Sequence, residues 1–163
     1  MEPFDSIWPI SDVPSQCISI YDGADVFQRD FSAAGEVHGT LFAAYWPQAE
    51  ILNGGLLQFF RNSTGVLAPE AVAAYERLGL PLLASNLQDA MDWFGSPYPR
   101  EREVRRARLD SASVSYENHP FESADDAIAK LVCEEHGGLE AAALAYVRQQ
   151  VAHEHPQGGE VPR

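Results

Sequence analysis

Three side-chain amides and two adjacent glycines stand close together near the middle of the chain, where they could bind a ligand. The amides belong to Asn53, Gln58 and Asn62, and the glycines are Gly54 and Gly55. Adjacent glycines permit a positive φ angle or a close approach of the backbone to another group. An amide both donates and accepts hydrogen bonds. This segment could therefore hold a small ligand or a peptide backbone in a pocket beside the glycines.

The same residues could instead hold the fold together. Side-chain amides cap helix ends and satisfy buried backbone groups, and large apolar residues flank these amides on both sides. We predict this structural role, with Phe59 and Phe60 in the core, because an internal hydrogen-bonded turn is the more economical explanation. The residues assigned to this turn, called the signature turn below, are Glu50, Asn53, Gly54, Gly55, Gln58, Phe59, Phe60 and Asn62.

The other reactive side chains do not suggest a catalytic or metal site. Cys133 and His136 are three residues apart on an expected helix, but no third group accompanies them, so we predict that Cys133 is a buried apolar residue. Cys17 and Cys133 lack metal-binding spacing, which predicts a pair of reduced, buried thiols. Glu134 and Glu135 diverge on a helix, and we expect both to be solvated. The sequence predicts no catalytic residue, no cofactor and no metal.

Residues 50–65 also resemble the signature of the DNA-mimic protein family, a widespread bacterial domain. The family pattern is roughly E-[VI]-x-N-G-G-[FL]-x-Q-[FY]-[FL]-x-N-[ST]-[ST]-G, and residues 50–51, 53–56, 58–60 and 62–65 match it. Leu56 stands where the family more often has an aromatic residue. The similarity extends over most of the chain as a matching order of helices.

The resemblance has consequences for function. The family takes its name from a member whose acidic dimer resembles duplex DNA and occupies the DNA-binding surface of a transcription factor. Carboxylates fixed on helices can imitate a phosphate array and meet the Lys and Arg side chains of such a factor. The resemblance implies an all-α, non-enzymatic protein that binds a basic protein, with a DNA-binding regulator as one candidate partner and a homodimer as one candidate state.

The charge of the chain suits such a partner. The formal net charge is −13 and the sequence pI is about 4.6, which argues against direct binding to nucleic acid or to an anionic membrane. Residues 1–60 contain eight acidic residues and one arginine, and residues 117–140 contain seven acidic residues and one lysine. Solubility alone could explain this charge; the alternative is an acidic face that docks a basic partner. The residues of that predicted acidic face are Asp22, Asp25, Asp30, Glu36, Glu122, Asp125 and Asp126.

A basic island lies between the two acidic stretches and is an awkward feature for a DNA mimic. Glu101 and Arg105 are four residues apart, so we predict an exposed helix from residue 99 to about residue 110. The basic island consists of Arg100, Arg102, Arg105, Arg106 and Arg108.

Apolar spacing is mostly helical, which predicts an all-α, multi-helix single domain. Helices are expected at about 23–33, from 36 to 53 with a kink or a fresh start near Trp46 because of Pro47, at 69–79, 81–95, 99–110, 123–137 and 139–151. Ser123 and Asp126 resemble a capping box at the start of the sixth helix. Residues 111–122 are expected to form a loop.

The length of 163 residues is enough for one domain with a core of its own. Residues 1–21 are expected to be irregular, with Phe4 and Trp8 as candidate anchors against the body. Residues 22–153 should form the helical domain, and residues 154–163 a flexible tail. No apolar stretch could span a membrane and no secretory signal is apparent, so we expect a cytoplasmic protein without a membrane partner.

Three functions stay open. The first is an acidic protein that binds a basic protein, with DNA mimicry as its mechanism. The second is an immunity-type or antitoxin-like inhibitor of a basic toxin. The third is a small-ligand-binding protein, or an enzyme, that uses the Asn-Gly-Gly turn.

Overall fold

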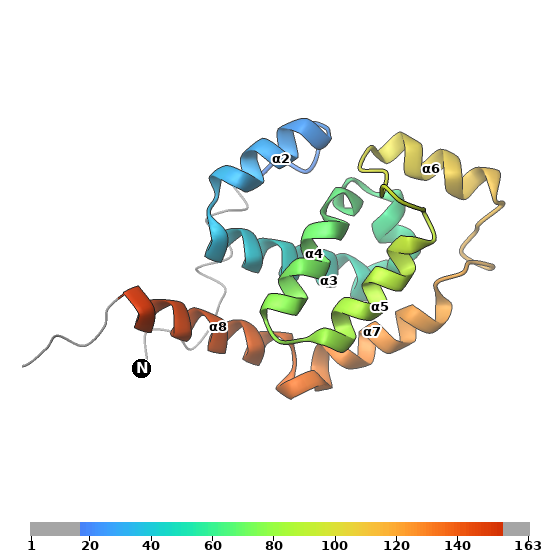
Figure 1. Cartoon of the computed structure of the whole chain (residues 1–163). Coiled ribbons are helices and arrows are strands. Elements are labelled where there is room, and N and C mark those ends of the chain that lie inside the picture. The colour runs from blue at the N-terminus through green and yellow to red at the C-terminus, as the bar shows by residue number, and fades with distance from the viewer. Residues whose placement is uncertain (1–16, 155–163) are drawn as a thin grey trace, which may run out of the picture.

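Seven α-helices make up most of residues 17–154, the part of the chain that the computed structural model describes (Figure 1). These residues contain no β-strand and only one isolated bridge, between Ser115 and Asn118. The predicted all-α fold is confirmed. Residues 1–16 and 155–163 lie outside the described residues, and so do the candidate anchors Phe4 and Trp8 and most of the predicted tail.

A long, broken helix runs through the centre of the fold. α2 (Ala24–Ala33) leads into α3 (Glu36–Arg61), whose non-helical dihedral angles fall at Gly54 and Gly55. α3 passes through Pro47 with helical angles, so no new helix starts there. Pro47 is buried, and the packing of this turn offsets the one hydrogen bond that a proline cannot donate. The glycines alone divide α3 into two helical parts, residues 36–53 and 56–61.

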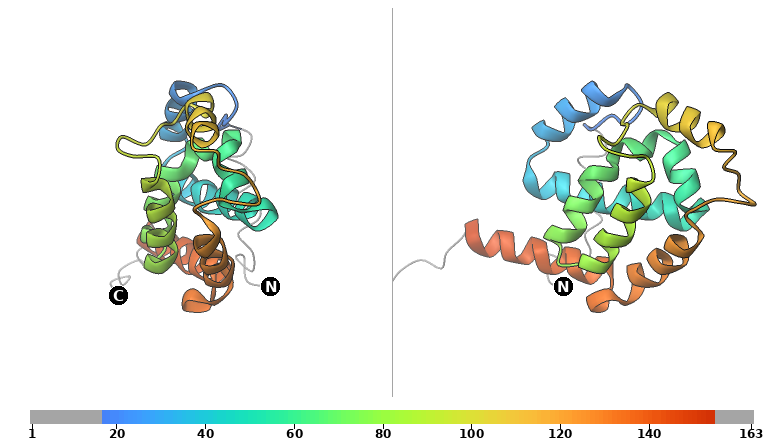
Figure 2. Two further views of the ribbon diagram at one scale, coloured as in Figure 1. Left: turned by 90° about the vertical axis from the view of Figure 1, so that its right-hand side faces the viewer. Right: turned by 45° about the vertical axis from the view of Figure 1, so that its right-hand side comes forward.

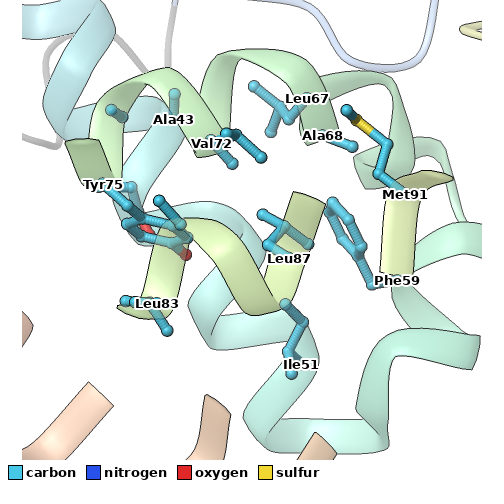
Figure 3. Close-up of a cluster of buried hydrophobic side chains, with 14 of the residues drawn as sticks. Ala43, Ile51, Phe59, Leu67, Ala68, Val72, Tyr75, Leu83, Leu87 and Met91 are labelled. Carbon is cyan, nitrogen blue, oxygen red and sulfur yellow. The ribbon is translucent and has the colours of Figure 1, made fainter. Parts of the chain in front are cut away.

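The core lies where α3 meets a hairpin of two shorter helices (Figure 3). The 3-10 helix η1 (Ser63–Leu67) leads into α4 (Ala68–Arg77), and α5 (Pro81–Asp92) follows after a short connection. Pro69 and Pro81 occupy first turns, as predicted, because the missing N–H has no helical partner there. The buried cluster draws on all of these elements and includes Ile51, Phe59, Leu67, Tyr75, Leu83 and Leu87.

Three further helices surround this core. α6 (Arg102–Ser111) lies at one edge, while α7 (Glu122–Glu134), the short η2 (Glu135–Gly137) and α8 (Leu139–Glu154) follow the opposite side (Figures 1 and 2). α7 packs against both α3 and α5. Aromatic rings fill the junction: the centroid of Phe60 lies 4.7 Å from that of Phe94 and 5.2 Å from that of Phe121.

Glu135 differs from its predicted solvated position. Its side chain is buried, and its carboxylate accepts hydrogen bonds from the backbone N–H groups of Leu82 and Leu83, both at 2.8 Å. These N–H groups belong to the first turn of α5, where no helical acceptor is available, and the positive end of the helix dipole favours a carboxylate. Glu135, which follows α7, therefore caps the start of α5. Residues this far apart in the chain cannot be paired from local spacing alone.

Two further local predictions are wrong. Cys17 and Cys133 are free and exposed rather than buried. Ser123 does not cap a helix: α7 begins one residue earlier, and no side chain caps it. Glu134 is exposed, as predicted, and forms an ion pair of 3.7 Å with Lys130.

Tyr146 and Tyr75 offer a matched test of packing. The Tyr146 hydroxyl is buried without a hydrogen-bond partner among the described residues, whereas the Tyr75 hydroxyl donates to the Ala44 carbonyl at 3.1 Å. We expect Tyr146→Phe to keep the free energy of unfolding unchanged or to raise it by about 1 kcal/mol, and Tyr75→Phe to lower it by about 1 kcal/mol. Urea unfolding measures both. A larger loss in Tyr146→Phe would contradict the assignment.

Candidate functional site

The signature turn is built around two glycines, and one of them has a backbone conformation that other residues rarely adopt. Gly55 has φ 75° and ψ 175°, a combination that side chains disfavour. A Cβ atom at Gly55 would stand 2.9 Å from Oδ2 of Asp125, and one at Gly54 would overlap the side-chain amide of Gln58. The turn therefore brings the backbone of α3 against a carboxylate of α7.

The Asp125 carboxylate supplies a hydrogen-bond acceptor at the start of the second helical part of α3. The N–H of Leu56, the first residue of the second helical part, donates to Oδ1 of Asp125 at 2.6 Å. Burial raises the pKa of the half-buried Asp125 carboxyl, and this outweighs the lowering by the bond from Leu56 and by His119. Asp125 thus links α7 to the signature turn, whereas the sequence places it on a solvent-facing acidic surface.

The amides of the turn converge on a second carboxylate, that of Glu50. Its Oε1 accepts from the side-chain amides of Gln58 at 3.0 Å and Asn62 at 2.5 Å, and its Oε2 accepts from the hydroxyl of Thr64 at 2.8 Å. Glu50 therefore ties both parts of α3 to η1. The sequence predicted helix capping by these amides, but two of them bind a side-chain carboxylate, and exposed Asn53 makes no side-chain hydrogen bond to a described residue.

A buried arginine occupies the other end of this segment. Arg105 of α6 is fully buried. Its Nε donates to the carbonyl of Phe60 at 2.9 Å and its Nη2 to that of Asn62 at 2.7 Å. Its Nη1 donates to the carbonyls of Pro99 and Arg100. The guanidinium thus binds carbonyls at the end of α3, which helical bonding leaves without donors.

Gly65 makes room for this arginine. A Cβ atom at Gly65 would stand 2.8 Å from Nε of Arg105 and 2.9 Å from the Phe59 carbonyl oxygen. Burial lowers the pKa of Arg105 from its ordinary value. The prediction of an exposed helix is therefore wrong at this position. The spacing of Arg105 and Leu109, four residues apart and both buried, was the signal for an inward face that sequence reasoning missed.

Most of the basic island is used in the same way. Arg102 and Arg106 each donate through Nε to the carbonyl of Arg61 at 3.1 Å. Arg100 binds the Glu70 carboxylate with two hydrogen bonds of 2.8 Å. Cations near the last carbonyls of a helix are favoured by its dipole. Arg102, Arg105 and Arg106 thus anchor the end of α3, Arg100 is paired with Glu70, and Arg108 is the exposed member of the island.

The predicted acidic face falls into two separate groups. Asp22, Asp25, Asp30 and Glu36 belong to the region of α2 and the start of α3, whereas α7 carries the others at the far end of the molecule (Figures 1 and 2). The Asp30 carboxylate accepts hydrogen bonds from the Arg29 side chain and from the backbone N–H of Ser19, and both lower the pKa of Asp30. The members that stay exposed are Asp22, Asp25, Glu36, Glu122 and Asp126.

The acids near the helix starts also have a local reason to be there. Asp25, Glu36 and Glu122 lie in the first turns of α2, α3 and α7, where a negative charge favours the helix. Asp22 accepts a hydrogen bond from the Ser19 hydroxyl at 2.6 Å, and Glu36 lies 3.8 Å from Arg77. Asp25, Glu122 and Asp126 form no ion pair with a described residue.

A groove in the described residues lies outside the signature turn. It has a volume of about 470 Å³, and its lining comes from α3, the end of α7, η2 and the start of α8. Residues 17–154 hold no group of three or more His, Cys, Asp and Glu side chains arranged for a metal ion. Within the same residues, no helix combines the length and the apolar composition needed to cross a membrane.

Comparison with known proteins gives one match. Residues 34–150 match the family model of the DMP19-like proteins, and this span includes the signature turn, the basic island and α7. No curated protein and no solved structure matches the chain. The chain belongs to the DMP19-like protein family, the DNA-mimic family that its signature segment resembles.

Proposed function

We propose that this protein is a non-enzymatic acidic protein that binds a basic protein, and that it acts as a DNA mimic on the DNA-binding surface of a transcription regulator. Membership of the DMP19-like family supports this function. So does the formal net charge of −13, because phosphate-binding Lys and Arg groups also accept carboxylates.

One observation carries the proposal. Arg61, Arg100, Arg102, Arg105 and Arg106 all donate hydrogen bonds to carbonyls or carboxylates of the protein itself. A freely exposed basic island would repel a basic partner, but Arg105 is fully buried, Arg100 is paired with Glu70, and Arg102 and Arg106 are half-buried. These arginines are therefore less available to repel a basic partner than the sequence suggests.

Some members of the predicted acidic face already bind other groups of the protein and are less available to a partner. Asp125 holds the signature turn and Asp30 is bound by Arg29 and Ser19, so changing either would disturb the fold as well as the surface. The members of the predicted acidic face that stay exposed are a first set, Asp22, Asp25 and Glu36, and a second set, Glu122 and Asp126. Because the two sets lie far apart, each is tested separately.

The partner must first be identified. Affinity capture with the immobilised full chain, from the cytoplasm of its own organism, followed by mass spectrometry, is the direct experiment. We expect a basic DNA-binding protein that duplex DNA displaces and that elutes as salt rises. A partner that ignores DNA and stays bound in high salt would exclude the mimic mechanism.

Neutralising the acidic set that contacts the partner is expected to slow association. The variants are Asp22→Asn with Asp25→Asn and Glu36→Gln, and separately Glu122→Gln with Asp126→Asn. At low salt one of them should reduce the association rate constant about tenfold, with a smaller change in dissociation, because steering acts on the encounter. Surface-binding kinetics against the captured partner at several salt concentrations measure this.

A control separates surface position from total charge. Glu76→Gln, Asp89→Asn and Glu103→Gln remove three exposed acids on three other helices and change the net charge as much as the first set does. If the control variant slowed association as much as the first set does, the effect would come from total charge and not from an acidic face. Unfolding curves run in parallel should show losses of no more than about 1 kcal/mol for each first-turn acid.

A further inference from the structure

A small cavity borders the signature turn on the side of Glu50. It has a volume of about 230 Å³ and lies between the segment before α2, the middle of α3, η1 and the start of α6. The two glycines of the turn do not line it. Charged, polar and apolar side chains meet in this cavity, and they include Ile20, Tyr21, Trp46, Glu50, Ser63 and Arg102.

Two opposite charges line this cavity without pairing with each other. The Glu50 carboxylate accepts hydrogen bonds from three neutral side chains. Arg102 donates through Nε to the carbonyl of Arg61, and its Nη1 and Nη2 form no hydrogen bond with a described residue. Within residues 17–154, neither Glu50 nor Arg102 takes part in an ion pair. Both side chains are half-buried, and a charge that is removed from water without a counterion is costly.

We propose that this cavity binds a free α-amino acid with an apolar side chain. A carboxylate can accept about four hydrogen bonds, so Glu50 has room for one more, which the ammonium group of the ligand donates. The ligand carboxylate binds the Nη groups of Arg102, and the Ser63 hydroxyl offers a further donor. A ligand with a single charge would leave either Glu50 or Arg102 without a counterion, whereas a zwitterion pairs with both. This inference is independent of the proposed function.

The apolar part of the lining determines the class of amino acid. Ile20, Tyr21 and Trp46 contribute aliphatic and aromatic surface beside the two charges, which favours an apolar ligand side chain. Tyr21 is 78% exposed, so its ring gains burial when it covers a ligand. The volume of about 230 Å³ is below the roughly 300–1,000 Å³ of pockets for drug-sized ligands. The cavity therefore suits a single amino acid better than a peptide or a nucleotide.

Ligand derivatives test the two charges on the full chain without any mutation. Isothermal titration calorimetry should detect binding of L-leucine or L-phenylalanine. The N-acetyl derivative of the amino acid that binds more tightly lacks the ammonium group, and its amide lacks the carboxylate. Each derivative should bind at least about tenfold more weakly, because one charge-assisted pair is lost. The absence of binding by both amino acids up to about 10 mM would overturn the proposal, and so would a derivative that binds as tightly as its parent amino acid.

Two arginines of α6 provide a matched pair of variants. Arg102 and Arg106 each donate through Nε to the Arg61 carbonyl at 3.1 Å, but of these two only Arg102 lines the cavity. Arg102→Gln should weaken binding of the amino acid about tenfold or more. Arg106→Gln removes the same charge and the same hydrogen bond, and it should change the affinity less than about twofold. Circular dichroism checks that both variants are folded. Equal weakening by the two substitutions would overturn the assignment of Arg102 to the ligand carboxylate.

Discussion

Replacing Arg105 with leucine is expected to unfold the protein or to lower its free energy of unfolding by at least about 4 kcal/mol. The change leaves the carbonyls of Phe60, Asn62, Pro99 and Arg100 without the donors that they have now. Each buried polar group left without a partner costs about 1–3 kcal/mol. A typical domain has only about 5–15 kcal/mol of stability in total.

Two comparison variants make this result specific. Arg108→Leu removes the same charge from an exposed position of the same helix and should change stability by no more than about 0.5 kcal/mol. Arg105→Lys should be closer to Arg105→Leu than to the parent, because an ammonium group cannot reproduce the planar fork of a guanidinium. Urea unfolding followed by circular dichroism is the measurement. A loss below about 1 kcal/mol in Arg105→Leu would refute the anchoring role.

Gly55→Ala should produce the second large effect, a loss of about 3–5 kcal/mol. Part of it is backbone strain, since φ at Gly55 is 75°, and strain of this kind costs about 1–3 kcal/mol. The rest comes from the new Cβ, which would displace the Asp125 carboxylate and break its hydrogen bond from the Leu56 N–H. A bond to a charged group contributes about 1.5–3 kcal/mol.

Gly79 provides the control for strain alone. Its φ is also 75°, but a Cβ atom there would meet nothing within 4 Å. Gly79→Ala should therefore cost about 1–2 kcal/mol. In the Asp125→Ala background, Gly55→Ala should cost less than it does in the parent, because the clash is gone. Equal costs at Gly55 and Gly79 would show that Asp125 does not constrain the turn.

The same variant separates a structural turn from a functional one. If the signature turn is structural, the Gly55→Ala variant should lose partner binding only in proportion to its loss of folded protein. An unchanged melting curve combined with lost partner binding would instead make the turn a binding site. The contacts of Glu50 and Asp125 support the structural role, because they hold the amides and the glycines within the protein.

Acidic residues have two different tasks in this chain. Glu50, Glu70, Asp125 and Glu135 bind donors inside the protein, whereas Asp25 and Asp126 face solvent. Variants that remove charge without regard to this division would mix loss of stability with loss of binding. The 24 acidic residues of the chain therefore outnumber the carboxylates that a partner could contact.

The amino-acid sequence by itself determined the order and type of the helices. Pro69 and Pro81 start helices, and Gly54 and Gly55 interrupt one, because proline and glycine act on the backbone at their own positions. The large apolar residues that flank the signature turn likewise predicted the burial of Phe59 and Phe60. These signals are local, so they can be read without knowing which helices meet.

Only the tertiary structure decided which polar groups are buried together. Arg105 meets carbonyls more than 40 residues earlier in the chain, at Phe60 and Asn62, and Asp125 meets the N–H of Leu56, 69 residues away. Their burial depends on donors and acceptors that packing brings close, and the same residue types at the same local spacing would be solvated on an unpacked helix. For the same reason the seven predicted surface acids were divided into two distant groups, and Arg105 of the basic island became part of the interior.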